Sequence, residues 1–231
     1  TGTDEGKSIV LDGGNVYITG YFSGVTDFDP GAGTANLITA GNYDIFICKL
    51  DTSGNYVWAK RMGGTGMDYG NAITLDASGN FFLTGYFSNT VDFDPDAGTT
   101  NRTSAGGYDI FVSKLDPTGS LLWVNTMGST GQDYGISIQV LSGHVYTTGY
   151  FDFTVDFDPG PGVQNIPSAG MSDIFISKMD DSGNYVYAKS LGGTDLDYAS
   201  SLSIDPSGNI YLTGYFSSTA DFDPGPGVEL K

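Results

Sequence analysis

The chain has 231 residues and a formal net charge of −18, because 27 acidic residues stand against 9 basic ones. This charge argues against nucleic acid and against anionic membrane surfaces as partners. No apolar run approaches the roughly 18 residues of a membrane span, and the single cysteine, Cys48, excludes an internal disulfide framework.

One stretch recurs four times with little change. The copies are Thr19–Pro30, Thr84–Pro95, Thr148–Pro159 and Thr213–Pro224. Their tyrosines, Tyr21, Tyr86, Tyr150 and Tyr215, are 65, 64 and 65 residues apart. Self-similarity at a long fixed period indicates a repeat architecture, in which each repeat is one structural unit.

Each repeat contains four short runs rich in β-branched and aromatic residues, bounded by turn residues. In the second repeat these runs are Ala72–Asp76, Asn80–Phe87, Tyr108–Asp116 and Ser120–Met127. Connections such as Asp116-Pro117-Thr118-Gly119-Ser120 predict a type I turn followed by a glycine bulge. No segment has a capped helical period, so we expect strands throughout.

Four-stranded antiparallel units in tandem are the blades of a β-propeller, and we predict this all-β fold. A two-sheet sandwich is the alternative, but it gives no reason for so regular a repeat. Alternate connections of a meander share a face. The tight hairpins therefore lie on one face, and the longer acidic connections lie on the other.

The predicted blades are 1–64, 65–129, 130–193 and a partial fourth blade at 194–231. About three and a half blades leave the ring incomplete, since propellers use roughly four to eight. We therefore expect further blades from a longer chain or from another copy.

The ordered motifs of the second and third repeats support a family resemblance. They are Tyr108-Asp109-Ile110-Phe111-Val112-Ser113-Lys114-Leu115-Asp116, Gly119, Trp123, Gly128, Asp133-Tyr134, Gly143 and Tyr146-Thr147-Thr148-Gly149-Tyr150. This set resembles the SBBP family of bacterial propeller repeats, over essentially the whole chain. The resemblance implies a secreted or surface-exposed protein without an assigned activity. The long Asp-Phe-Asp-Pro insert departs from a minimal SBBP repeat.

The acidic inserts contain the candidate metal ligands. Two aspartates at i and i+2 on an extended strand point to the same side, and Ca²⁺ takes six to eight oxygen ligands. An aspartate of the third strand enters the same face. The predicted Ca²⁺ ligands are Asp27, Asp29, Asp44, Asp92, Asp94, Asp109, Asp156, Asp158, Asp173, Asp221 and Asp223. The alternative is that these aspartates accept backbone hydrogen bonds in turns.

Other polar residues give weaker signals. Asp4, Asp68, Asp133 and Asp197 lie in the loops between blades, where we favour a role in tying glycine-rich backbone. A glycosidase pair needs two carboxyls in different environments, whereas here every repeat carries the same pair. His144 is predicted to be a turn residue, and Cys48 has no repeated histidine beside it. We expect no catalytic centre.

We therefore predict a secreted or cell-surface binding scaffold of the adhesion type, with inserts ordered by Ca²⁺. Its acidic face would bind a protein or a glycan, and the chain would neither enter a membrane nor bind nucleic acid. The alternatives are a polysaccharide hydrolase or lyase on a propeller scaffold, and a purely structural spacer. The tyrosine series is expected to be core, with carbohydrate stacking as an alternative.

Overall fold

The computed structural model describes residues 2–225 and 227–231. Thr1 and Pro226, which fall inside the first and last predicted blades, lie outside the described residues. The described part is built from antiparallel strands and contains no helix, as the sequence predicts. It therefore contains no helix long and apolar enough to cross a bilayer.

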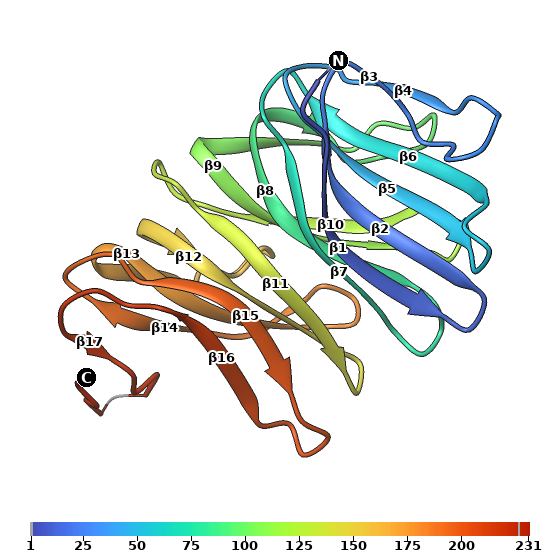
Figure 1. Ribbon diagram of the computed structural model, residues 1–231. Helices are drawn as coiled ribbons and strands as arrows, with labels where there is room; N and C mark the ends of the chain where they lie inside the picture. The colour runs from blue at the N-terminus through green and yellow to red at the C-terminus, as the bar shows by residue number, and fades with distance from the viewer. Residues whose placement is uncertain (1, 226) are drawn as a thin grey trace.

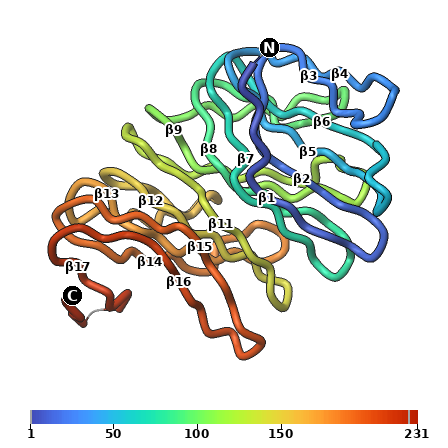
Figure 2. Tube along the Cα trace, in the orientation of Figure 1, coloured from blue at the N-terminus to red at the C-terminus, as the bar shows by residue number. Residues whose placement is uncertain are grey.

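The strands fall into successive blades, which fan out side by side along an arc (Figures 1 and 2). Blade 1 consists of β1 (Glu5–Asp12), β2 (Asn15–Phe22), β5 (Asp44–Asp51) and β6 (Tyr56–Gly64), with an insert hairpin of β3 (Val25–Asp27) and β4 (Asn36–Ile38). Blade 2 consists of β7 (Tyr69–Leu75), β8 (Phe81–Asp92), β9 (Asn101–Leu115) and β10 (Leu121–Met127).

The second half of the chain repeats this plan. Blade 3 consists of β11 (Tyr134–Leu141), β12 (His144–Asp156), β13 (Asn165–Asp180) and β14 (Tyr185–Gly193). Partial blade 4 consists of β15 (Tyr198–Ile204), β16 (Ile210–Tyr215) and β17 (Ala220–Asp221). The first strands of successive blades, β1, β7, β11 and β15, pack against one another. The fold is an all-β, propeller-like segment.

The tight hairpins have the predicted chemistry. In the turn after β5, the Gly54 amide donates to the Asp51 carbonyl at 2.9 Å, and Gly54 has a φ of +81°. Asp51 Oδ1 accepts hydrogen bonds from the backbone amides of Ser53 and Asn55. The same arrangement recurs at Asp180. These turns set the register of the strands that they join. The pairing of β2 with β5 is regular, whereas the pairings of β8 with β9 and of β12 with β13 each contain one bulge.

The strands beside the acidic inserts are longer than the sequence predicted, since the predicted runs of blade 2 were Asn80–Phe87 and Tyr108–Asp116. In blade 2, β8 runs on to Asp92 and β9 begins at Asn101, so the insert extends the central hairpin. The reason is apolar burial. Val91 and Phe93 are fully buried, and the Phe93 ring lies 5.1 Å from the Phe111 ring. The phenylalanine of the Asp-Phe-Asp-Pro motif is therefore a core residue.

The inserts of blade 2 and of partial blade 4 also connect neighbouring blades. Asp92 and Val91 at the end of β8 pair with Gly63 and Gly64 at the end of β6. In the same way, β17 pairs with Gly192 and Gly193 of β14. The insert of one blade thus hydrogen-bonds to the last strand of the preceding blade. This non-local pairing brings the aspartates of one repeat beside the third strand of the repeat before it.

Candidate functional site

A ladder of tyrosine rings runs across the blades near the ends of their first and second strands. Successive ring centroids are 4.3–4.7 Å apart from Tyr21 to Tyr198, and 6.3 Å apart at the last step to Tyr215. The ladder consists of Tyr21, Tyr69, Tyr86, Tyr134, Tyr150, Tyr198 and Tyr215. Such contacts stabilise by about 0.5–1.5 kcal/mol per aromatic pair. Packing is therefore the first role of these rings.

The third strand of blades 1 and 2 adds one more ring beside the ladder. The Tyr43 centroid lies 5.6 Å from that of Tyr69, and the Tyr108 centroid lies 5.6 Å from that of Tyr134. In blade 3 the corresponding residue of β13 is Ser172. The ladder there lacks its covering ring, between Tyr150 and Tyr198.

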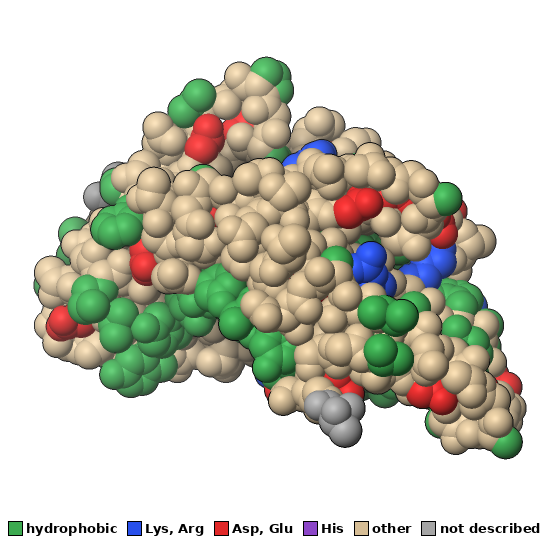
Figure 3. All heavy atoms as spheres, turned by 90° about the horizontal axis from the view of Figure 1, so that it is seen from above, with side chains coloured by type: hydrophobic (Ala, Val, Ile, Leu, Met, Phe, Trp, Pro, Cys, Tyr) green, Lys and Arg blue, Asp and Glu red, His purple; other side chains and the backbone are tan. Residues whose placement is uncertain are grey.

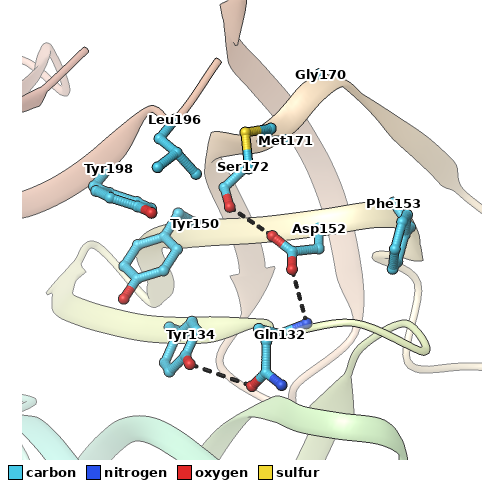
Figure 4. A pocket seen from close by; sticks show the side chains of 10 residues that line it. All are labelled: Gln132, Tyr134, Tyr150, Asp152, Phe153, Gly170, Met171, Ser172, Leu196 and Tyr198. Atoms are coloured by element: carbon cyan, nitrogen blue, oxygen red, sulfur yellow. Dashed lines mark hydrogen bonds between the residues drawn. The ribbon is translucent and has the colours of Figure 1, made fainter. Parts of the chain in front are cut away.

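A pocket of about 480 Å³ opens at this place (Figure 4). Tyr134, Tyr150 and Tyr198 line one side, and Phe153, Met171 and Leu196 complete the apolar part. Gly170 and Ser172 of β13 contribute backbone and a hydroxyl group. A cavity of this size accommodates a ring with space around it.

The polar part of the pocket is centred on Asp152. Its Oδ1 accepts a hydrogen bond from the Ser172 hydroxyl at 2.5 Å, and its Oδ2 accepts one from the Gln132 amide at 3.2 Å (Figure 4). The Gln132 side chain in turn accepts from the Tyr134 hydroxyl. Burial raises the pKa of Tyr150 to about 12, so its phenol remains a neutral hydrogen-bond donor.

Phe153 lies at the rim of the pocket and is unusual in both its exposure and its backbone conformation. It is 62% exposed and has a φ of +57°, a left-handed conformation that is rare for a bulky residue. The equivalent residues in the other repeats are Gly24, Asn89 and Ser218, which also have positive φ. The left-handed conformation therefore occurs at this position in all four repeats, with a bulge in blades 2 and 3, and blade 3 places an exposed aromatic side chain there. Figure 3 shows hydrophobic side chains gathered on the face seen from above, with acidic side chains at separate points.

The loop aspartates between blades act as predicted. Asp68 Oδ2 accepts from the Gly64 amide at 2.8 Å, and Asp133 Oδ2 accepts from the Ser129 amide. Asp197 Oδ2 accepts from the Gly193 amide at 2.7 Å. Each of these carboxylates is completely buried, and burial raises the pKa of Asp68 and Asp133 to about 7. They hold the glycine-rich loops between the blades in place by accepting hydrogen bonds from backbone amides.

The paired aspartates of the inserts also accept backbone hydrogen bonds. Asp92 Oδ1 accepts from the amides of Asp94 and Thr100, and Asp94 Oδ1 accepts from the Asp96 amide. The other inserts repeat this pattern, at Asp27 and Asp29, Asp156 and Asp158, and Asp221 and Asp223. The turn role that the sequence offered as the alternative is therefore present in all four inserts.

The third-strand aspartates lie deeper than the sequence predicted. Asp44, Asp109 and Asp173 are buried, and each has an Oδ1 atom without a hydrogen-bond partner among the described residues. Asp173 lines a pocket together with Asp221 and Asp223, the pair of the following repeat. Within residues 2–225 and 227–231, no three Asp, Glu, His or Cys side chains lie close enough to hold a metal ion. Ca²⁺ ordering stays a prediction.

His144 and Cys48, whose side chains are of types common in catalytic sites, lie in a turn and in the core. His144 lies in its predicted turn, where its ring Nδ1 is 3.1 Å from the Ser142 carbonyl oxygen. Cys48 is buried, and burial raises the pKa of its thiol to about 11. A thiol with so high a pKa is a poor nucleophile at neutral pH.

Comparison with known proteins supports the repeat type. The chain is 28% identical over 205 residues to the uncharacterized WD repeat-containing protein L264 of Acanthamoeba polyphaga mimivirus, covering 78% of this chain and 15% of that protein. It is 25% identical over 162 residues to the regulatory protein FlaEY of Caulobacter vibrioides, covering 70% of this chain and 17% of that protein.

No protein-family model matches the chain. WD repeats are four-stranded propeller blades, so the first similarity agrees with the observed sheets. The chain is a repeat-based, propeller-like β segment. It spans 15% and 17% of the lengths of the two relatives. The narrower SBBP assignment stays a prediction.

The sequence analysis did not identify the pocket at Ser172. A signal was present, because the four repeats can be compared position by position. Ser172 replaces Tyr43 and Tyr108, and Phe153 replaces Gly24 and Asn89. Blade 3 therefore differs from blades 1 and 2 in two ways. A small residue replaces a tyrosine, and an exposed aromatic residue replaces Gly or Asn.

Proposed function

We propose that this chain is a non-catalytic binding scaffold that holds an aromatic side chain of a partner protein in the Ser172 pocket. The observation that carries the proposal is the missing ring. Tyr43 and Tyr108 cover the tyrosine ladder in blades 1 and 2, whereas Ser172 leaves it open in blade 3. The chain's own tyrosines therefore indicate which group fits the space.

Charge favours a basic partner. The net charge of −18 raises the local concentration of cationic segments and speeds their association. An aromatic ring in an apolar pocket then supplies the anchor, as buried aromatic residues do at many interfaces. Gln132, Asp152 and the Tyr134 hydroxyl provide polar groups beside it. A segment that combines an aromatic residue with nearby Lys or Arg fits this surface.

Two substitutions test this proposal. Ser172→Tyr restores the ring and should abolish binding at the pocket. Tyr108→Ser removes the ring in blade 2 and should create a second site. The probes are acetylated pentapeptides with a central Tyr, Phe, Trp or Leu flanked by lysines, with matched peptides that have a central Ser as controls, and binding is measured by calorimetry.

We expect the aromatic peptides to bind the unmodified chain and to lose at least about tenfold in affinity with Ser172→Tyr. Equal binding to the Ser172→Tyr variant contradicts the proposal. A parallel panel of neutral oligosaccharides decides the ligand class. If only the sugars bind, and Ser172→Tyr blocks them, the scaffold binds glycans instead of a protein.

Adhesion, an extracellular or cell-surface location and Ca²⁺ ordering belong to this proposal and rest on the sequence alone. Their first test is a thermal melt of chelator-treated protein with millimolar CaCl₂ or MgCl₂. Binding to the folded state raises the midpoint by mass action. A rise that is selective for Ca²⁺, and that disappears when Asp92 and Asp94 are changed to Asn, supports ordered metal sites. An equal response to both salts removes Ca²⁺ from the proposal.

A further inference from the structure

A second pocket lies between blade 3 and partial blade 4, and it is lined by carboxylates. Its volume is about 360 Å³. Asp173 of β13 and Ser190 and Gly192 of β14 form one side, and Asp221 and Asp223 form the other. Lys189 also lines the space. Three carboxylates and one ammonium group therefore line the pocket, and its net negative charge favours a cation.

Asp173 is the buried member of this group. It is 2% exposed, and its Oδ2 accepts one hydrogen bond, from the Ala169 amide at 2.9 Å. Its Oδ1 has no partner among the described residues. Burial, with the nearby Asp197 carboxylate, raises the pKa of Asp173 to about 6. A buried carboxylate with an unpaired oxygen lowers the stability of the folded state, so a positively charged hydrogen-bond donor would stabilise it.

Blade 1 shows which donor fits. The residue at the position of Ser190 is Arg61, since both precede the Met62 or Leu191 and the two glycines that end β6 and β14. The Arg61 guanidinium forms an ion pair with Oδ2 of Asp44, which is the counterpart of Asp173. Asp44 Oδ2 also accepts from the Ala40 amide at 2.9 Å, as Asp173 Oδ2 does from Ala169. The carboxylate accepts the same backbone hydrogen bond in both blades, and its Oδ1 has no partner among the described residues in either blade. Blade 1 adds the arginine at Oδ2.

Blade 2 places the second of the chain's two arginines at the same level. Arg102 of β9 donates a hydrogen bond to the Val124 carbonyl of β10 at 3.0 Å. Arg102 corresponds to Ile166, and Val124 corresponds to Ala188; both of these blade 3 residues line the carboxylate pocket. Arg102 thus contacts backbone carbonyls, no ion pair joins it to Asp109 among the described residues, and Thr126 stands at the position of Arg61. The pairing of an arginine with the third-strand aspartate is therefore shown by blade 1, whereas blade 3 has Ser190 and a pocket at that place.

We propose that the pocket at Asp173 and Ser190 binds the guanidinium group of an arginine side chain from a partner protein. A guanidinium presents a planar fork of donors to carboxylates, which an ammonium cannot do. A single metal ion fits the site less well, because no three acidic side chains of the described residues lie close enough to hold one. The inference goes beyond the aromatic pocket at Ser172, because none of its steps uses that pocket.

The test is a titration of the full chain with N-acetyl-L-argininamide, followed by NMR. Its neutral isostere, N-acetyl-L-citrullinamide, is the matched control. We expect saturable shifts of the Gly192 and Asp221 amides with the arginine compound only. Ser190→Arg places an arginine in the pocket as blade 1 does, and it should weaken binding at least about tenfold while the fold remains intact.

The reciprocal variant is Arg61→Ser, which should add a second set of shifts at Gly63 and Asp92. Ser172→Tyr should leave binding of the arginine compound unchanged. The proposal for the Asp173 pocket is therefore tested separately from the proposal for the Ser172 pocket. The proposal is wrong if citrullinamide binds equally, or if Ser190→Arg leaves the affinity unchanged. It is also wrong if CaCl₂ shifts the same amides while the arginine compound does not.

Discussion

Blades 1 and 3 share the plan of four antiparallel strands and many residues at equivalent positions, but they differ at two places. Blade 1 fills them with its own side chains, Tyr43 and Arg61, which contact the tyrosine ladder and Asp44. Blade 3 has Ser172 and Ser190 at these places, and a pocket lies at each. In a repeat protein, a repeat whose side chains fill such a place thus shows which group is missing from a repeat that has a pocket there. The filled blade indicates the chemistry of a ligand for the open one.

The largest expected effect concerns the core, where the two blades should behave alike. The Phe46 ring lies 4.8 Å from that of Phe28, and the Phe175 ring lies 5.1 Å from that of Phe157. Phe46→Ala and Phe175→Ala should each lower the free energy of unfolding by about 3–5 kcal/mol. Urea denaturation measures both. A cost that is several-fold smaller in one blade would mean that the difference between the blades extends into the core.

The second effect concerns the arginine. Arg61→Ser leaves the buried Asp44 without its ion-pair partner and should lower the free energy of unfolding by about 1.5–3 kcal/mol, at the lower end because Arg61 is partly exposed. Ser190→Arg should raise stability in blade 3. Thermal melts of the two single variants test this opposition. Equal destabilisation by both variants would contradict the proposed difference between blades 1 and 3.

The third effect is the pH dependence of stability. Burial raises the pKa of Asp68 and Asp133 to about 7, and that of Asp109 and Asp173 to about 6. The unfolded chain has ordinary values near ~4. The folded state therefore binds more protons between pH 4 and pH 7. These groups contribute fully below pH 4, and their contribution is lost as the pH rises through 6 to 7.

The free energy of unfolding should therefore fall between pH 5 and pH 7, by about 1.4 kcal/mol per pH unit for each such proton. Asp173→Asn should remove part of this slope. Asp197, Asp221, Asp223 and Lys189 remain in both proteins, so they cancel in the comparison. Asp44→Asn should have a smaller effect, because Arg61 opposes the rise that burial causes in the pKa of Asp44. Equal changes of slope would contradict the difference between the blades.

The smallest effect is that of the missing ring. Ser172→Tyr should stabilise the protein by about 0.5–1.5 kcal/mol, because the new ring contacts Tyr150 and Tyr198 as Tyr108 contacts Tyr86 and Tyr134. Tyr108→Ser should cost a similar amount. Chemical denaturation of both variants is the measurement. Destabilisation by Ser172→Tyr would show that the pocket is not shaped for a ring.

Much of the fold could be predicted because its causes are local. The 65- and 64-residue spacing, the strand chemistry and the Asp-to-Gly turns are all visible in short stretches of sequence. The turns at Asp51 and Asp180 have the predicted glycine with positive φ, at Gly54 and Gly183. The inserts were harder to predict. They were predicted as longer acidic connections outside the strands, whereas the burial of Val91 and Phe93 extends the central hairpin into them.

The candidate site depended on contacts between repeats. The sequence determined that each repeat has an aspartate pair and a third-strand aspartate, because these residues are fixed by position in the repeat. Only the tertiary structure decided that Asp173 lies beside Asp221 and Asp223 of the next repeat. The physical reason is the pairing of β17 with the end of β14, which is set by non-local hydrogen bonds and apolar burial. Packing between blades likewise decided that a serine in place of Tyr43 or Arg61 leaves a pocket.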